Sequence, residues 1–253
     1  DTGELAWGEG VGPGRLPEPD ALLAHIARTL ERPSFAGKRV VVTAGPTREA
    51  IDPVRFISNR SSGKMGVAVA AAAWRRGADT ILVAGPLAVD PPVGPAVIRV
   101  ETVADMDEAV RAELPAADVL VMAAAPADFR PKRAAASKLK RVHGAGAARV
   151  LELETTEDIL AGSRHLRRPG AVVVGFALET EDVVANARAK LASKDLDMIV
   201  VNDATQPGAG FEVDTNKVAI LYRDGSSEDL PLLSKDEVAE AILDRVEALL
   251  HGR

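Results

Sequence analysis

The stretch SNRSSGKMG at residues 58–66 combines small, hydroxyl-bearing and basic residues in an order that could hold a phosphate group. A P-loop needs Gly, four residues and then Gly-Lys-Ser/Thr, so that backbone amides hold phosphates and the hydroxyl holds Mg²⁺. Ser58 stands where the first Gly should be, and Met65 stands where the hydroxyl should be. A Gly-Lys pair nevertheless opens an apolar segment typical of a helix, and free amides at a helix start attract anions. The stretch therefore predicts an anion site that is not a P-loop.

The segment leading to this stretch is long for its position. GPTREAIDPVRFISNRSSGKMG places about twenty residues between a predicted strand and its helix, and long ordered loops of this kind are usually functional. The alternative is that Ser62 only caps the helix and that nothing binds there. Capping alone would not need arginines, an asparagine and so long a loop. We therefore expect Ser61, Ser62 and Gly63 to bind an anion.

A second candidate is a cationic segment at residues 130–149. It holds seven Lys or Arg and no acidic residue, in a chain whose formal net charge is −6. It follows Asp128 and the end of a predicted strand, which is where ligands of α/β proteins bind. Its Ala and Gly content predicts a flap that closes over a polyphosphate, with Lys138, Lys140 and Arg141 in it. A solvated surface loop is the alternative.

Other residues carry weaker signals. Lys190 and Lys194 are four apart on one predicted helix and so share a face, a pattern that alone is typical of surface lysines. Phe176 ends the predicted strand VVVGF, where it could pack in the core or stack on a base. His143 and His165 have no partners at metal-ligand spacing, so the metal ligands stay unknown.

A nicotinamide-dependent enzyme of the short-chain dehydrogenase kind is an alternative reading of GKMGVAVAAAAWRRGADTILVAG. The glycine fingerprint G-x-G-x-x-G is incomplete, because only Gly63 and Gly66 are present. The second strand ends in residues 84–86, Ala-Gly-Pro, with no acid to hold a ribose hydroxyl. The only tyrosine is Tyr222, and Ser226 follows it where such enzymes have a lysine. The residues therefore disfavour this chemistry.

The elements that must position these residues alternate between strand and helix. Such alternation predicts an α/β fold with a doubly wound, mostly parallel, Rossmann-like sheet, followed by a C-terminal β-hairpin and a helix. Expected strands cover residues 38–44, 80–83, 97–100, 119–124, 172–176 and 198–201, and the hairpin covers 217–223 and 228–232. Expected helices cover residues 20–30, 65–76, 104–114, 156–166, 181–194 and 235–250.

Composition narrows the class of protein. The acidic balance argues against a nucleic-acid binder, and the longest apolar run is too short to cross a membrane. The chain has no cysteine, which fits a reducing cytoplasm, and DTGELAWGEG lacks the apolar core of a signal peptide. The Gly- and Pro-rich stretch EGVGPGRLPEP reads as a linker. Because the chain does not begin with Met, we expect it to be a piece of a longer protein.

GPTREAIDPVRFISNRSSGKMG, AAAPADFRPK, SKLKR, EDIL, GFALET and ND-x₇-F occur in this order. With them the chain closely resembles bacterial phosphopantothenate–cysteine ligases, which in many bacteria form the C-terminal half of a bifunctional coenzyme A biosynthesis protein. The resemblance runs from about Gly37 to the C-terminus. It implies a ligase domain at residues 37–253, and at residues 1–36 a linker and the tail of a flavin-dependent decarboxylase half that would carry FMN.

The resemblance also implies site residues. Asn59 matches the Asn that steadies an acyl-nucleotide intermediate, and Lys138 matches the first Lys of a K-x-K-K motif used in nucleotide binding and the second half-reaction. Arg141 stands where that motif ends in Lys, so its role is open, because Arg and Lys differ in donor geometry. Positions that match CTP contacts are Ala124, Ala125, Asp128, Lys138, Glu157, Asp158, Ile159, Leu160, Phe176, Lys190 and Lys194.

The implied reaction explains the need for cations. A carboxylate is first joined to CMP as a mixed anhydride with release of pyrophosphate, and the amine of cysteine then displaces CMP. Each unscreened repulsion between anions about 4 Å apart would cost roughly 4 kcal/mol near a protein surface. Lys138, Lys140, Lys190 and Lys194 with Mg²⁺ would offset it. We expect the loop to bind the phosphate of phosphopantothenate through Asn59, Ser61, Ser62, Gly63, Lys64, Met65 and Gly66.

The expected partners are CTP, phosphopantothenate, L-cysteine, a second copy of the chain in a homodimer, and the decarboxylase half. The C-terminal hairpin is a candidate for the dimer contact. A non-enzymatic module that binds nucleotides or nucleic acid through the basic flap is the remaining alternative.

Overall fold

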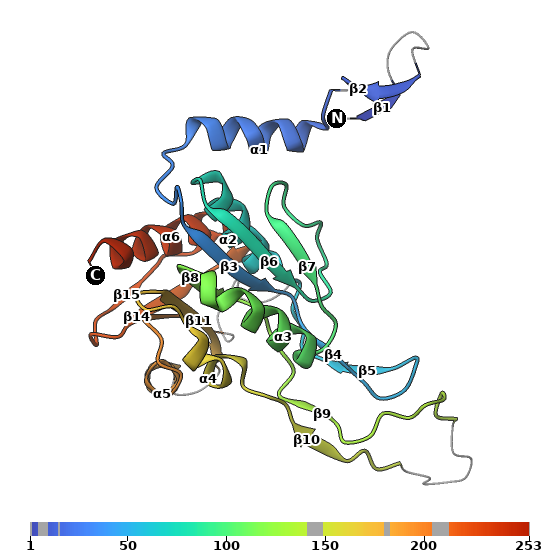
Figure 1. Cartoon of the computed structure of the whole chain (residues 1–253). Helices are drawn as coiled ribbons and strands as arrows, with labels where there is room; N and C mark the ends of the chain where they lie inside the picture. Colours follow the sequence, from blue (N-terminus) through green and yellow to red (C-terminus); the bar gives the residue numbers. More distant parts are fainter. Residues whose placement is uncertain are drawn as a thin grey trace.

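The computed structural model of the chain describes residues 2–4, 10–14, 16–140, 149–179, 183–203 and 213–252. Its centre is an eight-stranded sheet in the order β15-β14-β12-β11-β8-β3-β6-β7 (Figure 1). The six strands from β12 to β7 are parallel. Counted along the chain they take the order 3-2-1-4-5-6, which is that of a doubly wound dinucleotide-binding fold. They are β3 (Arg39–Ala44), β6 (Asp79–Ala84), β7 (Ala96–Arg99), β8 (Val119–Met122), β11 (Val172–Glu179) and β12 (Met198–Asp203).

The far edge of the sheet is antiparallel. Strand β14 (Val218–Tyr222) pairs with β12, and β15 (Ser227–Asp229) pairs with β14. The chain then enters α6 (Lys235–His251), whose N-cap Ser234 forms a capping box with Glu237. The C-terminal hairpin and helix expected from the sequence are therefore confirmed.

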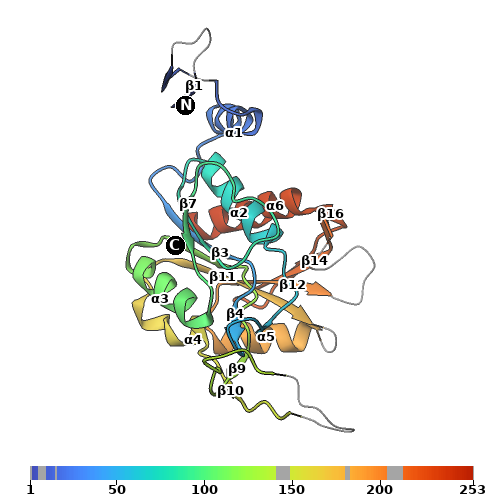
Figure 2. The same cartoon turned by 90° about the vertical axis from the view of Figure 1, so that its right-hand side faces the viewer.

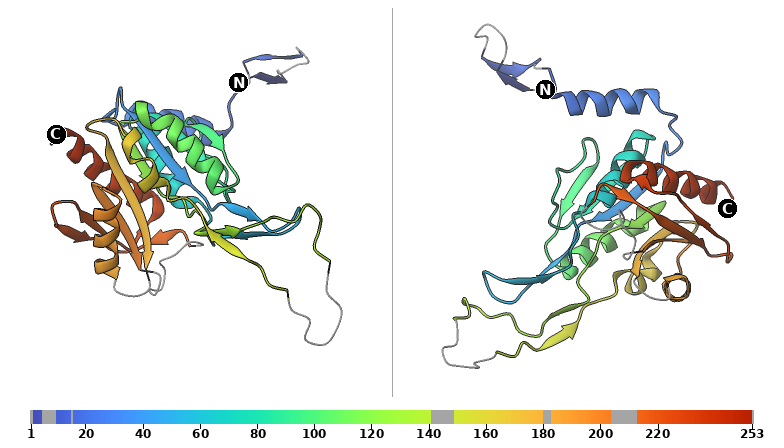
Figure 3. Two further views of the ribbon diagram at one scale, coloured as in Figure 1. Left: turned by 60° about the horizontal axis from the view of Figure 1, so that its bottom comes forward. Right: turned by 180° about the vertical axis from the view of Figure 1, so that it is seen from behind.

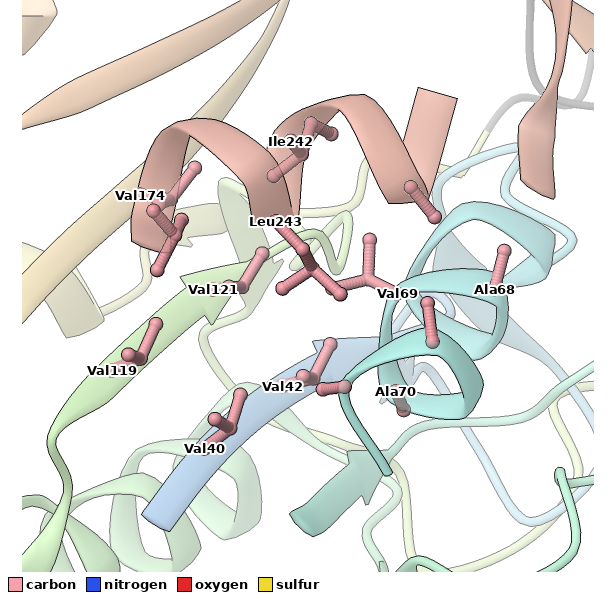
Figure 4. Packing of buried hydrophobic residues seen from close by; sticks show 14 of the residues in the cluster. Val40, Val42, Ala68, Val69, Ala70, Val119, Val121, Val174, Ile242 and Leu243 are labelled. Atoms are coloured by element: carbon pink, nitrogen blue, oxygen red, sulfur yellow. The ribbon is translucent and has the colours of Figure 1, made fainter. Parts of the chain in front are cut away.

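Helices cover both faces of the sheet (Figure 2). On one face lie α2 (Lys64–Arg75) and α6, which bury apolar side chains against the valines of β3, β8 and β11 (Figure 4). On the other face lie α3 (Val103–Glu113), α4 (Ile159–Gly162) and α5 (Val183–Ser193). Because the parallel strands are buried on both faces, their sequences are continuous apolar runs. The predicted fold class is confirmed.

Short strand pairs extend from this body. The long loop after β3 folds into a hairpin, and the strands before and after the cationic segment pair at the base of an arm that projects from the body (Figure 3). In the described residues, four short strand pairs and two 3₁₀ turns lie outside the central sheet. In order these are β4 (Arg48–Ala50) with β5 (Phe56–Ser58), β9 (Phe129–Pro131) with β10 (Leu153–Thr155), β13 (Thr215–Asn216) with β16 (Leu233–Ser234), β1 (Thr2–Glu4) with β2 (Val11–Pro13), η2 (Leu114–Ala116) and η3 (Arg164–Leu166).

One predicted helix is wrong in extent. Instead of a helix over residues 156–166, the chain forms the single turn of α4 followed by η3. Thr156 is held in extended structure, because its N–H donates to the carbonyl of Asp128 (3.0 Å) and its hydroxyl to that of Ala127 (2.6 Å). Asp158 then caps the next turn by accepting from the N–H of Ala161 (3.1 Å).

Helix α1 (Pro19–Leu30) confirms the predicted N-terminal helix and lies apart from the two helical layers (Figure 1). Among the described residues, no helix combines the length and apolar character that crossing a membrane requires.

A polar cluster ties the hairpin to α6. Arg245 donates to Glu228 through Nε (3.0 Å) and Nη2 (2.8 Å), and Tyr222 donates to the same carboxylate. The hydrogen bonds from Arg245, and next that from Tyr222, lower the pKa of Glu228 from its ordinary 4.5 to about 2. The carboxylate is therefore stabilised in its charged form in the folded state.

We expect Glu228→Gln to lower the free energy of unfolding at pH 7 by about 1–2 kcal/mol, a value reduced for partial exposure of the pair. Because the folded pKa lies below the unfolded one, this stability is present above pH 4.5 and is lost as the pH falls through about 2. Urea unfolding at pH 7, 4 and 2 should show the wild type and the variant converging. Glu247→Gln, which removes a pair with the exposed Arg32, is the control and should change stability by less than about 0.5 kcal/mol. A constant difference across this pH range would contradict the assignment.

Candidate active site at the switch point of the sheet

The strand order reverses between β3 and β8, so the loops that follow these strands diverge and leave a crevice. Backbone and side-chain bonds join the two loops at its base. The N–H of Ala125 donates to the carbonyl of Gly45 (2.9 Å), and that of Ala127 to the hydroxyl of Thr47 (2.9 Å). Asn59 Nδ2 donates to the carbonyl of Pro126 (2.9 Å). Asn59 therefore lies where the two loops meet.

One cavity in this crevice, of about 320 Å³, is here called the loop pocket. It contains six of the seven residues predicted to bind the substrate phosphate, together with the ends of β8, β11 and β12. Its lining residues are Asn59, Arg60, Ser61, Ser62, Gly63, Lys64, Met65, Ala123, Ala124, Ala125, Phe176, Ala177, Leu178, Asn202, Asn216 and Lys235.

The start of α2 opens on the loop pocket. The N-cap is Gly63 at φ 80°, not Ser62, and no side chain caps the helix. A side chain at position 63 would adopt a strained backbone and meet Leu87 Cδ2, which explains the glycine. The hydroxyls of Ser61 and Ser62 reach the amides of residues 63 and 64 only at 3.4 and 3.5 Å. The positive end of the helix dipole is therefore directed at the pocket.

Gly66 differs in position from the other members of the predicted phosphate-binding set. It lies inside α2 and does not line the loop pocket. A Cβ at this position would be 2.6 Å from the carbonyl oxygen of Thr43 and from Ala44 Cβ. Gly66 therefore allows α2 to approach β3 closely and places the helix start.

Two lysines serve the loop pocket. Lys64 Nζ forms an ion pair with Asp214 (2.5 Å), which lowers the pKa of that carboxyl. Lys235, which sequence reasoning missed, is 6 % exposed and donates to the carbonyl of Val213 (2.5 Å). Burial, and next the charge of Lys64, lowers the pKa of Lys235. Both lysines line the loop pocket, and Lys64 is already paired with Asp214.

Two asparagines were also missed as site residues. Asn202 Nδ2 donates to Asn216 Oδ1 (2.9 Å), while Asn202 Oδ1 is buried with no hydrogen-bond partner among the described residues. A buried unsatisfied acceptor in a cavity is suited to a ligand donor. Asn202 belongs to the ND-x₇-F motif, so a sequence signal existed for it. Asn216 and Lys235 had none.

A second cavity of about 340 Å³, here called the α4 pocket, adjoins the loop pocket and shares Ala124 and Phe176 with it. Lys194, the residue that follows α5, lines it and pairs with Asp158 (3.1 Å). Of the positions that match CTP contacts, it gathers Ala124, Asp128, Glu157, Asp158, Ile159, Leu160, Phe176 and Lys194, and its other lining residues are Met122, Pro126, Ala127, Phe129, Thr155 and Thr156.

The remaining predicted cations lie outside both pockets. Lys190 is exposed on α5, one turn before Lys194. Lys138 and Lys140 are exposed on the arm, and Arg141 falls outside the described residues. Within a single chain, Lys138, Lys190 and Lys194 therefore do not surround one cleft, contrary to the expectation. Of these three lysines, only Lys194 lines either of the two pockets.

The β4–β5 hairpin explains the position of Lys138. Leu139 follows Lys138 in the chain. Its N–H donates to Asp52 Oδ2 (3.0 Å), and its carbonyl accepts from Arg55 Nη2 (2.7 Å). Several hydrogen bonds hold the pKa of the buried Asp52 carboxyl far below its ordinary value, and the bond from the Arg55 side chain has the largest effect. These contacts bind the arm to the hairpin and keep Lys138 on the arm.

No group of three His, Asp or Glu side chains suited to a metal occurs in the described part of the chain. Mg²⁺ bound with a nucleotide commonly uses one or two carboxylates, with phosphates and water completing its shell. Asp128, Glu157 and Asp158 in the α4 pocket fit that requirement.

Known proteins are similar to this chain in sequence and in fold. A family model described as "DNA/pantothenate metabolism flavoprotein C-terminal domain" matches residues 35–250. The "Coenzyme A biosynthesis bifunctional protein CoaBC" of Bacillus subtilis is 47 % identical over 98 % of this chain and 61 % of its own length. The chain thus spans about three fifths of the length of this curated relative.

Two solved structures have the same fold. A crystal structure of the C-terminal domain of a CoaBC protein has a TM-score of 0.73 and 41 % identity, covering 87 % of this chain and 99 % of that domain. A Cab2 variant in complex with phosphopantothenate-cysteine has a TM-score of 0.66 at 16 % identity, covering 93 % of this chain and 96 % of that one, a likeness of fold alone. By sequence and fold, the chain belongs to the family of DNA/pantothenate metabolism flavoprotein C-terminal domains, which confirms the family indicated by its motifs.

Proposed function

We propose that this chain is the phosphopantothenate–cysteine ligase part of a coenzyme A biosynthesis protein and that it uses CTP. The observation that carries the proposal is the pair of adjoining pockets at the switch point, which meet at Ala124 and Phe176 close to Asn59. One pocket has an uncapped helix start and two lysines, and the other has the 157–160 segment and Lys194. Two anionic substrates that must react with each other need such a divided site.

We assign the substrates by charge. The loop pocket takes the phosphate of phosphopantothenate at the start of α2, with Lys64 and Lys235 as counter-charges. The α4 pocket takes the cytidine nucleotide, with Lys194 near its phosphates. With this assignment, we expect the substrate carboxylate and the α-phosphate to meet near the shared boundary of the two pockets. Asn59, whose Nδ2 donates to the carbonyl of Pro126 beside this boundary, would steady the acyl intermediate.

The reaction then proceeds in two balanced steps. A carboxylate oxygen bonds to the α-phosphorus, and pyrophosphate leaves with the electrons of the broken P–O bond. The amine nitrogen of cysteine next bonds to the acyl carbon, the C–O bond to CMP breaks, and the amine loses a proton. The chain contributes position and a field of fixed positive charge, which is how phosphoryl transfer is generally catalysed. Mg²⁺, held with the nucleotide by the α4-pocket carboxylates, would supply charge neutralisation.

An omission assay tests the proposed function. Pyrophosphate release should require both CTP and phosphopantothenate, and CMP release should additionally require cysteine. ATP, GTP and UTP should each replace CTP poorly. Nucleotide binding without pyrophosphate release would instead indicate a binding module. A fluorescence change on titration with NAD(P)H would favour the dehydrogenase alternative.

Lys190 in α5 and Lys194, the residue after its end, provide a matched pair of variants. Lys194→Met should raise the KM for CTP about tenfold, because it removes one charge-assisted contact from the α4 pocket. Lys190→Met changes a charge of the same sign one turn away, outside the pocket, and should raise the KM less than about twofold. Steady-state pyrophosphate release at varied CTP measures both. Equal effects would contradict the assignment of the nucleotide to the α4 pocket.

We further propose that the chain forms a homodimer through its arm and the adjoining β4–β5 hairpin. Phe129 and Leu153 lie on one face of the β9–β10 ladder and are 50 and 47 % exposed, and Phe56 of β5 is 48 % exposed. Exposed apolar side chains gathered in this way mark interaction surfaces. In such a dimer the arm would carry Lys138 to the partner's crevice, which accounts for its absence from the pockets of its own chain.

Phe129→Ser combined with Leu153→Ser should convert the dimer to a monomer in sedimentation velocity at micromolar concentration, because it removes the apolar contact. Leu232→Ser is the control, since this residue is similarly exposed (52 %) but ends the segment predicted as the C-terminal hairpin, three residues after β15. Dissociation by the control and not by the arm variant would place the contact at the C-terminal hairpin.

A further inference from the structure

Helix α5 ends beside the α4 pocket in a turn of defined geometry. The N–H of Leu196 donates to the carbonyl of Leu191 (2.9 Å), and that of Asp195 to the carbonyl of Ala192 (3.2 Å). This pair of bonds is a Schellman motif, in which the residue after the C-cap adopts the left-handed conformation. Asp195 is that residue, with φ 51°, and Lys194 is the C-cap before it. The motif therefore fixes where the side chain of Lys194 leaves the helix.

Asp195 adopts this conformation although it is not glycine. In the described part of the chain, every other residue with a positive φ is a glycine. A left-handed conformation costs free energy for a residue with a Cβ atom, so it persists where surrounding contacts impose it. Arg223 makes two such contacts, an ion pair with the Asp195 carboxylate (2.8 Å) and a hydrogen bond from Nη2 to the Asp195 carbonyl (3.1 Å).

The guanidinium of Arg167 joins this helix end to the segment at residues 157–160. Its Nη1 donates to the carbonyl of Asp195 (2.8 Å), and its Nη2 donates to the carbonyls of Lys194 (3.1 Å) and Leu160 (2.6 Å). Leu160 and Lys194 both line the α4 pocket, whereas Arg167 lines neither pocket. One side chain outside the pocket thus holds together two of the segments that form it.

These contacts suit an arginine. Carbonyls in the last turn of a helix lack partners within the helix, and their partial negative charge stabilises a cation. A planar guanidinium presents its N–H groups in a fixed fork, so it can bond to two segments at once, whereas a lysine ammonium is a point charge on a flexible stem. Arg167 Nε is buried and has no hydrogen-bond partner among the described residues, a cost that the three bonds to carbonyls must outweigh.

Two other arginines contact the same helix end without joining it to the pocket segment. Arg164 donates to the carbonyl of Ser193, and Arg223 donates to the carbonyls of Asp195 and Leu196 (both 3.1 Å). Among the contacts of the described residues, only Arg167 connects the end of α5 with residues 157–160. A role in capping α5 would be shared by all three arginines, but the connection is particular to Arg167.

We propose that Arg167 is a positioning residue for nucleotide binding. Together with the left-handed turn at Asp195, it holds Lys194 at a fixed separation from the 157–160 segment, so that the ammonium group meets the nucleotide phosphates at a defined place. Lys194 Nζ already reaches this segment, where it pairs with Asp158 (3.1 Å). A group ordered in advance loses less entropy when the ligand binds. The proposal rests on the proposed function, since it takes the α4 pocket as the nucleotide pocket.

Arg167→Lys tests this role, because it keeps the charge but loses the fork that spans the two segments. The KM for CTP should rise about fivefold, while kcat and the KM for phosphopantothenate should change less than about twofold. Arg164→Lys is the control: the same substitution on an arginine that contacts only the helix end should change the KM for CTP less than about twofold. Steady-state pyrophosphate release measures all three constants, and equal effects of the two variants would overturn the proposal.

A double-mutant cycle shows whether Arg167 acts through Lys194. In the Lys194→Met background, Arg167→Lys should raise the KM for CTP less than about twofold, because the side chain that it positions is gone. If the two single effects multiplied to about fiftyfold in the double variant, Arg167 would act independently of Lys194, and the proposal would be wrong.

The backbone at Asp195 provides a second matched pair. Asp195→Val and Asp195→Gly both remove the carboxylate that pairs with Arg223, but valine resists the left-handed conformation and glycine adopts it freely. The KM for CTP should rise about fivefold in the valine variant and less than about twofold in the glycine variant. Equal values in the two variants would mean that the turn does not position Lys194.

Amide hydrogen exchange without nucleotide tests the connection itself. In Arg167→Lys, peptides that cover residues 158–163 and peptides that cover residues 191–197 should both exchange at least about threefold faster, because one guanidinium holds both segments. In Arg164→Lys only the second set should change. Unchanged exchange at residues 158–163 in Arg167→Lys would overturn the proposal. Loss of CTP-dependent pyrophosphate release in the unsubstituted protein would contradict the proposed function alone, since the exchange measurement needs no nucleotide.

Discussion

The structure depends on how the loops after β3 and β8 are joined where the sheet reverses its strand order. Three bonds hold them together: Ala124 N–H to the hydroxyl of Thr43 (3.1 Å), Ala125 N–H to the carbonyl of Gly45 (2.9 Å), and Ala127 N–H to the hydroxyl of Thr47 (2.9 Å). Thr43 and Thr47 are fully buried. The bonds to their hydroxyls therefore form away from water, where an unpaired polar group is costly. The base of the crevice is therefore held together by bonds within the protein itself.

This base divides the crevice into two pockets that differ in the charge of their lining side chains. The loop pocket offers an uncapped helix start and two lysines, whereas the α4 pocket surrounds one lysine with three carboxylates. The chain as a whole is acidic, with a formal charge of −6. Of the two pockets, the loop pocket alone has more basic than acidic side chains among its lining residues, and a nucleotide in the α4 pocket would need a bound cation to offset the three carboxylates.

The arm and helix α1 both extend from the body of the protein and are attached to it in a similar way. The arm is bound to the β4–β5 hairpin by Asp52 and Arg55, and it presents apolar side chains outward. Helix α1 is bound by Arg28 and also presents apolar side chains outward. In both cases polar contacts fix the element on the body while its apolar surface remains uncovered. Both elements are therefore suited to assembly with other domains or copies.

The sequence alone determined the order of strands and helices, because buried parallel strands must be continuous apolar runs and the helices between them must be amphipathic. Its motifs also identified the family, the loop at residues 58–66 and most of the α4 pocket. It overestimated the helix at residues 156–166, because backbone bonds to the loop after β8 hold Thr156 in extended structure, and no local pattern reports such a bond.

Only the tertiary structure decided which charges share a pocket. Lys235 reads as an ordinary first residue of a helix, yet the packing of α6 beside α2 buries it in the same pocket as Lys64, the first residue of α2. Lys138 belongs to a strongly cationic segment, yet contacts with the β4–β5 hairpin keep it on the arm. Sequence spacing fixes which residues are neighbours within one element, whereas meeting across a crevice depends on sheet order and loop docking. For this reason the elements could be predicted, while the distribution of lysines between the pockets and the arm could not.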